Sequence, residues 1–394
     1  SASATIVAGT LAERCQMAAY LSYSVLLTGF IYPVVVHAIW SPQGFLSARA
    51  PSPLWDVGAI DFAGSGVVHV TGGAVAFVAT YILGPRWGRF YNERMEKLPE
   101  PKPMPGHSVA LQVLGAFILW FSWYGFNSGS ALEVDETLNS RLAALCAVNT
   151  TMSAASAGVT ALFANLIIME RRSGEATFDI VKLSNGAIGG LVAITAGCAF
   201  VEPWAAMVIG IVGGLIYLGT SHLLIKLCID DAVDAIPVHG ANGIWGVIAV
   251  GLFARKNRII EVYGTAIHEG WFYSPSDATL LGAQFVEIGF IIGWVVLVMF
   301  PFFMLLNYIG WLRSDSLEEL VGLDISYHGT SMFREEDEEI KEEDISEFTQ
   351  RKELRVKRRK VRQKVLQDGE IDGRSFHSSQ LPLSQVDKII NGES

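Results

Sequence analysis

Two histidines, His69 and His239, stand in closely similar surroundings in the two halves of the sequence. Seven residues separate His69 from Asp61 in DFAGSGVVHVTGGAVAFVA, and seven separate His239 from Asp231 in DAVDAIPVHGANGIWGVIAVG. In both stretches small residues and then an apolar run follow the histidine. A neutral imidazole offers one hydrogen-bond donor and one acceptor, and burial disfavours its charged form. Two facing rings could share a hydrogen bond and present nitrogen atoms to a small polar solute or a relayed proton.

Other roles for these residues stay open on the pattern alone. A single buried histidine is usually a structural residue with satisfied hydrogen bonds, although the repeated spacing weighs against that. Two histidines on different helices could also ligate a haem, whereas a zinc site needs further ligands that no neighbouring residue supplies. Asp61 stands where a helix is expected to begin, and a carboxylate there accepts backbone N–H groups. Capping a helix and orienting a cation path are both open roles for it.

The elements that must position these residues are long apolar helices. The sequence is 51% hydrophobic and 17% charged, whereas soluble domains carry about 25% charged residues. A helix spans a bilayer with roughly 20 apolar residues. Eight segments reach or approach that length: 17–40, 62–84, 108–128, 142–169, 183–201, 204–228, 236–254 and 280–309. Residues 1–12 read as the end of a ninth. The prediction is an all-α, polytopic membrane helix bundle embedded in a lipid bilayer.

The two histidine stretches are predicted to enter the membrane from opposite faces. Five spans separate them when both ends are counted one way, which is the pattern of an inverted repeat with a site at its midplane. Lys and Arg gather in the loops 85–107 and 170–182. The positive-inside rule places these loops, and by counting also the C-terminus, in the cytoplasm. The basic loop 255–258 is an exception on the outer side.

The composition changes after about residue 312. Residues 335–347 form an acidic run and residues 351–364 a basic one, as in a solvated helix or a disordered tail that could touch anionic lipid. We therefore divide the chain into a membrane domain (1–312), a cytoplasmic segment (313–333) and a charged tail (334–394). The net charge of −10 belongs to loops and tail, and it gives no reason to expect a nucleic-acid partner.

Five stretches resemble, in order, signature segments of the ammonium transporter (Amt/MEP/Rh) family, Amt branch. They are AER (12–14), DFAGSGVVHVTGG (61–73), WYGFNSGSA (123–131), DDAVDAIPVHGANGIWG (230–246) and GLDISYHG (322–329). The resemblance runs from residue 1 to about 333. It implies eleven spans in an inverted five-plus-five helix repeat, and a homotrimer with one pore in each subunit. On this comparison the chain is expected to begin near the end of the family's third span, so that about three helices are largely missing.

The resemblance also implies roles for residues along a pore. His69 and His239 resemble the family's twin pore histidines. Trp123 resembles a residue of the pore wall, and Phe126 resembles one of two stacked phenylalanines that gate the pore. The partner of Phe126 is expected in the third span, before Ser1.

Further residues resemble the family's recruitment and regulatory positions. Trp40 and Ser130 resemble members of an outer site that recruits the ammonium cation, and Asp61 resembles the acidic residue beneath that site. Ser326 stands where plant relatives carry a phosphorylatable threonine, and is expected to be regulatory.

The function implied by the resemblance is transport, and no enzyme activity, cofactor or metal is expected. An ammonium ion is recruited, loses its proton at the apolar pore, and passes the histidines as ammonia. Methylammonium is expected to serve as an analogue, and nitrogen uptake at the plasma membrane is the implied role. Three alternatives remain: an ammonium sensor, a haem-binding electron carrier, and an inactive partial chain.

Overall fold

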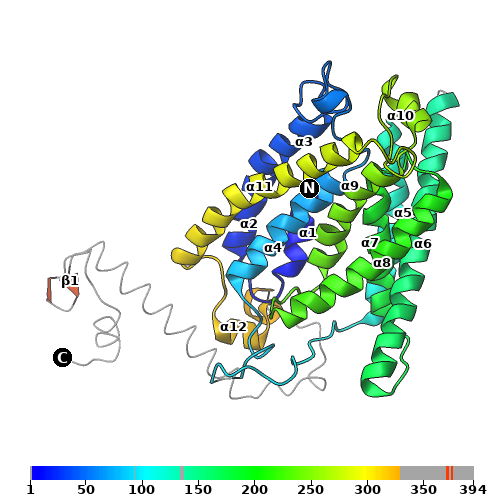
Figure 1. Cartoon of the computed structure of the whole chain (residues 1–394). Coiled ribbons are helices and arrows are strands. Elements are labelled where there is room, and N and C mark those ends of the chain that lie inside the picture. The colour runs from blue at the N-terminus through cyan, green and yellow to red at the C-terminus, as the bar shows by residue number, and fades with distance from the viewer. Residues whose placement is uncertain (1, 93, 134–136, 329–369, 372–373, 376–394) are drawn as a thin grey trace. The chain divides into compact units, whose positions relative to one another are not determined.

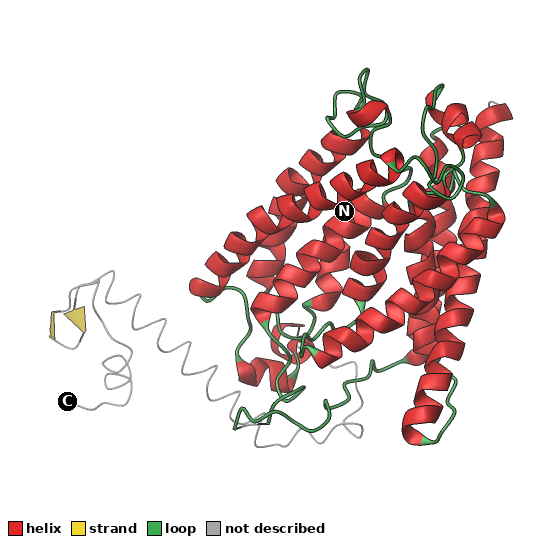
Figure 2. Ribbon diagram, viewed as in Figure 1, coloured by secondary structure: helices red, strands yellow, loops and turns green. Residues whose placement is uncertain are grey.

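The computed structural model describes all residues except 1, 93, 134–136, 329–369, 372–373 and 376–394. The chain divides into two compact units, residues 1–314 and residues 315–394. Figure 2 shows that the described part of the first unit consists of helices joined by loops. The second unit begins with α12 (Ser316–Val321) and η6 (Asp324–His328), and it also contains a short antiparallel pair of strands, β1 (Glu370–Ile371) and β2 (Arg374–Ser375).

The first unit follows the order of elements that the hydropathy pattern predicts (Figure 1). Its helices are α1 (Ala2–Thr10), α2 (Met17–Leu26), η1 (Leu27–Ile31), α3 (Tyr32–Trp40), η2 (Leu54–Asp56), η3 (Ser65–Val70), α4 (Thr71–Leu83), α5 (Val109–Ser128), η4 (Gly129–Ala131), α6 (Thr137–Ser173), α7 (Ile180–Thr195), α8 (Pro203–Lys226), η5 (Ile236–Ala241), α9 (Asn242–Phe253), α10 (Lys256–Tyr263) and α11 (Thr279–Tyr308).

Seven helical runs in the described part of the chain are long and apolar enough to cross a membrane. They are Met17–Trp40, Ser65–Leu83, Val109–Ala131, Thr137–Ser173, Pro203–Lys226, Ile236–Phe253 and Thr279–Tyr308. Each agrees within a few residues with a predicted span. The prediction of an all-α polytopic membrane bundle is confirmed.

The helix predicted at 183–201 ends earlier in the structure than the sequence indicates. Its helix stops at Thr195, and the backbone then turns inside the bundle. Non-helical backbone is tolerated at membrane depth only where protein or enclosed water satisfies its polar groups. Here the buried amide of Asn149 donates to the carbonyls of Cys198 and Val201, at 2.8 Å each. The apolar sequence of this segment predicts a continuous helix. The side chain that stabilises the turn instead, Asn149, lies on another helix and gives no signal within the segment itself.

The two helices that carry the histidines are neighbours and run in opposite directions. The first turns of each, η3 and η5, pack against the body of the other, α9 and α4 respectively. This crossed pattern is that of an antiparallel pair, as the inverted repeat requires. The backbones touch where small residues meet: a Cβ added to Gly73 would lie 2.3 Å from the Cα of Gly240. Small residues of this kind let membrane helices approach closely.

A buried ion cluster ties together loops at the ends of several helices. Arg86 donates to the carboxylate of Asp230 through Nε at 2.8 Å and Nη2 at 3.0 Å. Arg14, from the AER stretch, donates to the carbonyls of Asp230 and Gly84. Burial alone would raise the pKa of Asp230, but the hydrogen bonds and charge of Arg86 hold this pKa below its usual value. The cluster fixes the loop that leads into η5.

Replacing Gly73 with Ala should lower the thermal unfolding midpoint in detergent, because the new methyl group overlaps the backbone of Gly240. Overpacking of this kind typically costs about 1–3 kcal/mol. The matched control is Gly219→Ala on α8, where nothing lies within 4 Å of the added Cβ and the midpoint should hold or rise slightly. Equal midpoints for the two variants would contradict the close crossing.

Candidate functional site

The structure brings His69 and His239 into direct contact. Their Nδ1 atoms lie 3.1 Å apart, and the rings are nearly parallel, with centroids 5.1 Å apart and an interplanar angle of 12°. In such a bond one nitrogen donates a proton and the other accepts it. The two rings cannot both be charged without breaking this bond. The pair therefore holds one shared proton between the two Nδ1 atoms.

Aromatic rings enclose the free side of His69. Trp123 stacks on it with centroids 5.2 Å apart at 11°, and Phe126 is tilted against it at 5.6 Å. Trp123 is itself held by a 2.9 Å bond from Nε1 to the hydroxyl of Thr195. The Nε2 atom of His69 is buried and has no protein hydrogen-bond partner. An unsatisfied buried nitrogen costs about 1–3 kcal/mol, so this atom is a natural contact for a small polar solute.

The haem alternative finds no support in this geometry. In the hydrogen-bonded pair each Nδ1 atom faces the other, which leaves neither of these two atoms open to a metal. The observed separation of the Nδ1 atoms is 3.1 Å. Within the described residues no group of three His, Cys, Asp or Glu side chains is placed to hold a metal ion.

Asp61 caps the start of η3, the helix turn that carries His69. Its Oδ1 accepts the N–H groups of Gly64 and Ser65 at 2.8 and 2.9 Å. Its Oδ2 accepts those of Gly66 and Val67 at 2.9 and 2.8 Å. The first N–H groups of a helix have no partner within it, and here one carboxylate satisfies four of them. Gly64 has a φ of +108°, a conformation that favours glycine.

Trp40 and Ser130 each have a partner within the protein. The Trp40 indole donates from Nε1 to the backbone carbonyl of Asp61 at 2.6 Å. The Ser130 hydroxyl donates to the carbonyl of Phe126 at 2.8 Å. Both residues stand at the same end of the bundle, where α3 and α5 finish (Figure 1). Their grouping into one recruitment site stays a prediction.

Polar side chains inside two helices were missed by the sequence reasoning. Thr195 in α7 orients Trp123. In α11, the Gln284 amide accepts the N–H of Ile60 and donates to its carbonyl, at 2.8 Å each. These bonds fix the loop just before Asp61. Glu287 follows Gln284 in the same helix and is fully buried. The available signal was their polarity within the apolar run LLGAQFVEIGF, because polar residues at membrane depth are functional candidates.

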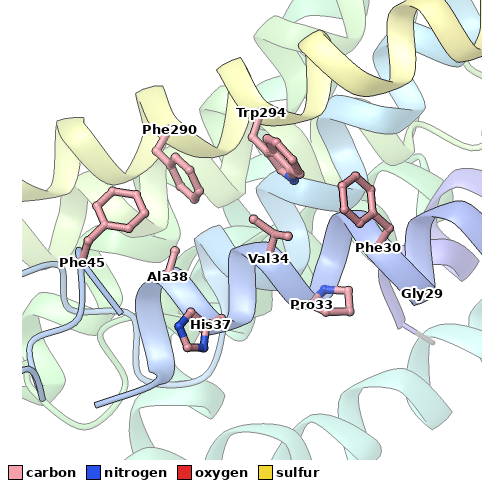
Figure 3. A pocket seen from close by; sticks show the side chains of 9 residues that line it. All are labelled: Gly29, Phe30, Pro33, Val34, His37, Ala38, Phe45, Phe290 and Trp294. Carbon is pink, nitrogen blue, oxygen red and sulfur yellow. The ribbon is translucent and has the colours of Figure 1, made fainter. Parts of the chain in front are cut away.

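A separate apolar groove of about 400 Å³ lies between α11 and the stretch formed by η1, α3 and the loop after α3 (Figure 3). Phe30, Phe45, Phe290 and Trp294 line it, with His37 at its side. Neither histidine of the pair contributes to its wall. The groove is therefore distinct from the candidate site.

Replacing Asp61 with Ala should destabilise the fold by about 3 kcal/mol or more, because four N–H groups lose a charged acceptor, and such bonds are worth about 1.5–3 kcal/mol each. The control is Asp179→Ala, which removes a part-buried cap that accepts only the N–H groups of Val181 and Lys182 and should cost about 1 kcal/mol. Thermal midpoints in detergent would measure both. A smaller shift for Asp61→Ala than for the control would contradict this account of the cap.

Comparison with known proteins identifies relatives that match most of this chain. A model of the Ammonium Transporter Family matches residues 1–333. Ammonium transporter 1 member 3 of Solanum lycopersicum is 41% identical over 339 residues, which are 83% of this chain and 71% of that protein. Putative ammonium transporter 1 member 5 of Arabidopsis thaliana is 43% identical over 338 residues, which are 83% of this chain and 66% of that protein. The chain thus spans about two thirds of the length of these relatives.

Solved structures share the same fold. The structure titled Sensor Amt Protein matches with a TM-score of 0.67 and 32% identity, covering 83% of this chain and 74% of that one. Candida albicans Mep2 matches with a TM-score of 0.66 and 29% identity, covering 79% of this chain and 63% of that one. The helical arrangement around the histidine pair therefore belongs to a known membrane fold.

Proposed function

Because this chain belongs to the ammonium transporter family, we propose that it moves ammonium or ammonia across a membrane past the His69–His239 pair. The observation that carries the proposal is the direct Nδ1 contact at 3.1 Å together with the unpartnered, buried Nε2 of His69. Such a nitrogen can hydrogen-bond a small neutral solute in an apolar passage. The names of the relatives describe transporters and not enzymes.

Recruitment of the cation takes place at the end of the bundle where Trp40 and Ser130 stand. A ring face attracts a cation by roughly 0.5–2 kcal/mol. The Ser130 hydroxyl donates a hydrogen bond to the backbone carbonyl of Phe126, so its oxygen keeps lone pairs for an N–H group of ammonium. Asp61 lies beneath, and both of its oxygens accept backbone N–H groups. It acts through its charge and its support of the helix, and does not ligate the cation.

Ammonium gives up its proton to water at the recruitment end, because the passage behind Phe126 and Trp123 is apolar. A charge at membrane depth costs at least about 2.5–3.5 kcal/mol, whereas neutral ammonia avoids that cost. Ammonia meets the open nitrogen of His69 and can move along the imidazole pair. The shared Nδ1 hydrogen bond keeps the pair from carrying two charges, so the passage suits a neutral solute.

The setting of this transport is proposed from the loops and from the family. The basic loops 85–107 and 170–182 favour a cytoplasmic side for these ends and for the C-terminus. The family resemblance supports a homotrimer in the plasma membrane that takes up nitrogen. The division of the tail at residue 333 also stays a prediction, because residues 329–369 lie outside the described part of the chain.

Sensing of ammonium is the second candidate function. The observation in its favour is the structural match to a protein titled as a sensor. Sensing and transport share the recruitment step and differ in whether solute passes the histidines. Uptake measurements separate them.

Uptake of labelled methylammonium, competed by ammonium, tests the proposal in cells that lack their own ammonium transporters. The paired change of His69 and His239 to Ala should lower uptake about tenfold, which corresponds to about 1.4 kcal/mol and is near the worth of one hydrogen bond. The control is His222→Ala, whose Nδ1 bonds the Leu218 carbonyl within α8; its uptake should match the parent.

Two results would count against the transport proposal. One is absence of uptake by a folded parent protein at the cell surface, which would favour the sensor. The other is unchanged uptake by the double variant, which would remove the histidines from the path.

Phosphorylation of Ser326 is proposed to close the pore. Ser326 lies in η6, half-buried, with its hydroxyl 3.5 Å from the Leu323 carbonyl. A phosphate adds a charge of about −1.5 to −2 in the same short turn as Asp324 and would displace the turn by repulsion. Ser326→Asp should reduce methylammonium uptake severalfold, whereas Ser326→Ala should leave it unchanged. Parental uptake by Ser326→Asp would contradict this regulation.

A further inference from the structure

Glu287 is a buried carboxyl group to which the transport path assigns no role. It lies in α11 and is 0% exposed. Neither of its carboxyl oxygens has a hydrogen-bond donor from the protein. An isolated ionised carboxylate in apolar surroundings is so costly that such groups take up a proton instead. The burial and the missing donors therefore indicate a neutral acid at this position.

The Glu287 side chain points at the start of the helix that carries His69. A Cβ added to Gly66 would lie 2.3 Å from Oε1 of Glu287, with side-chain carbons of Ile291 and Val247 at 3.1 Å. Apolar side chains therefore adjoin the acid at Gly66. On the same residue, the Gly66 N–H donates to Oδ2 of Asp61 at 2.9 Å. The Asp61 and Glu287 carboxyl groups therefore both lie beside Gly66.

The other ionisable groups near these two carboxyl groups do not neutralise them. Tyr263 faces them from α10, and Arg49, from the loop after α3, lies over the Tyr263 ring at 5.9 Å. Tyr32 and Cys198 lie near Asp61 and are neutral in their ordinary forms at pH 7. Across the described part of the chain, no Lys, Arg or His forms an ion pair with Asp61 or Glu287. Two negative charges on carboxyl groups that adjoin the same residue would repel each other strongly in an apolar site.

We propose that Glu287 and Asp61 form a proton-binding site, in which Glu287 carries the proton and donates its O–H to a carboxylate oxygen of Asp61. The assignment of the charge follows from the partners. Asp61 accepts four backbone N–H groups, which favour its ionised form, whereas Glu287 has none. The site leaves one negative charge at the start of η3 and orients the cap. It stands whether or not the histidine pair conducts ammonium.

Infrared spectroscopy of the protein in lipid vesicles at neutral pH tests the site. The parent should show the carbonyl band of a protonated carboxylic acid, with a shift in heavy water. Glu287→Gln should lose this band and keep the fold, because the neutral amide has the same shape and offers an N–H donor to Asp61. The control is Glu202→Gln, at a partly exposed position before α8, which should keep the band.

An absent band in the parent, or an unchanged band in Glu287→Gln, would overturn the proposal by showing that Glu287 is ionised. Thermal unfolding against pH gives a second readout that does not depend on spectral assignment. The folded protein holds a proton that the unfolded chain releases, so stability should fall as pH rises above the ordinary carboxyl range. Glu287→Gln should lack this part of the slope. The same slope in parent and variant would also overturn the proposal.

Discussion

The hydrogen bond between the two imidazoles is the constraint on which the rest of the bundle depends. A separation of 3.1 Å between the Nδ1 atoms requires the two helices that carry the histidines to pack closely, and here they do so as an antiparallel pair. Gly73 and Gly240 make that contact possible, since a side chain at Gly73 would meet the backbone of the other helix. The stacked Trp123 then sets the plane of the His69 ring. These features come from four elements, η3, α4, α5 and η5, which are far apart in the sequence.

A second theme is how polar groups are kept satisfied at membrane depth. The start of η3 presents backbone N–H groups to the interior, and Asp61 accepts four of them. Gln284 accepts the N–H of Ile60 and donates to its carbonyl. Asn149 donates to the carbonyls of Cys198 and Val201 in the irregular backbone after α7. Full charges with ionic partners lie instead at helix ends, as in the Arg86–Asp230 pair. Among the described residues, neither His69 nor His239 takes part in an ion pair. Such surroundings suit the neutral solute that we propose, because a charge there would lack a partner.

The sequence alone predicted much of this arrangement, for reasons that are local. Apolar length located the spans, and the repeated Asp-x7-His spacing predicted that His69 and His239 would meet from opposite faces. The end of α7 was not predictable in this way, because the turn after Thr195 is stabilised by Asn149 from another helix. The roles of Thr195 and Glu287 also depend on neighbours distant in the sequence. The charged runs 335–347 and 351–364 lie outside the described residues, and their lipid contact stays a prediction.

The most direct measurement of the central claim is the protonation and coupling of the two imidazoles in a bilayer. Solid-state NMR of protein labelled with ¹⁵N at histidine would detect it, with single His69→Ala and His239→Ala variants to assign the signals. We expect two neutral rings at neutral pH with a coupling across the hydrogen bond between their Nδ1 atoms, and we expect either variant to lose this coupling. Two uncoupled rings, or a charged imidazolium on both, would contradict it.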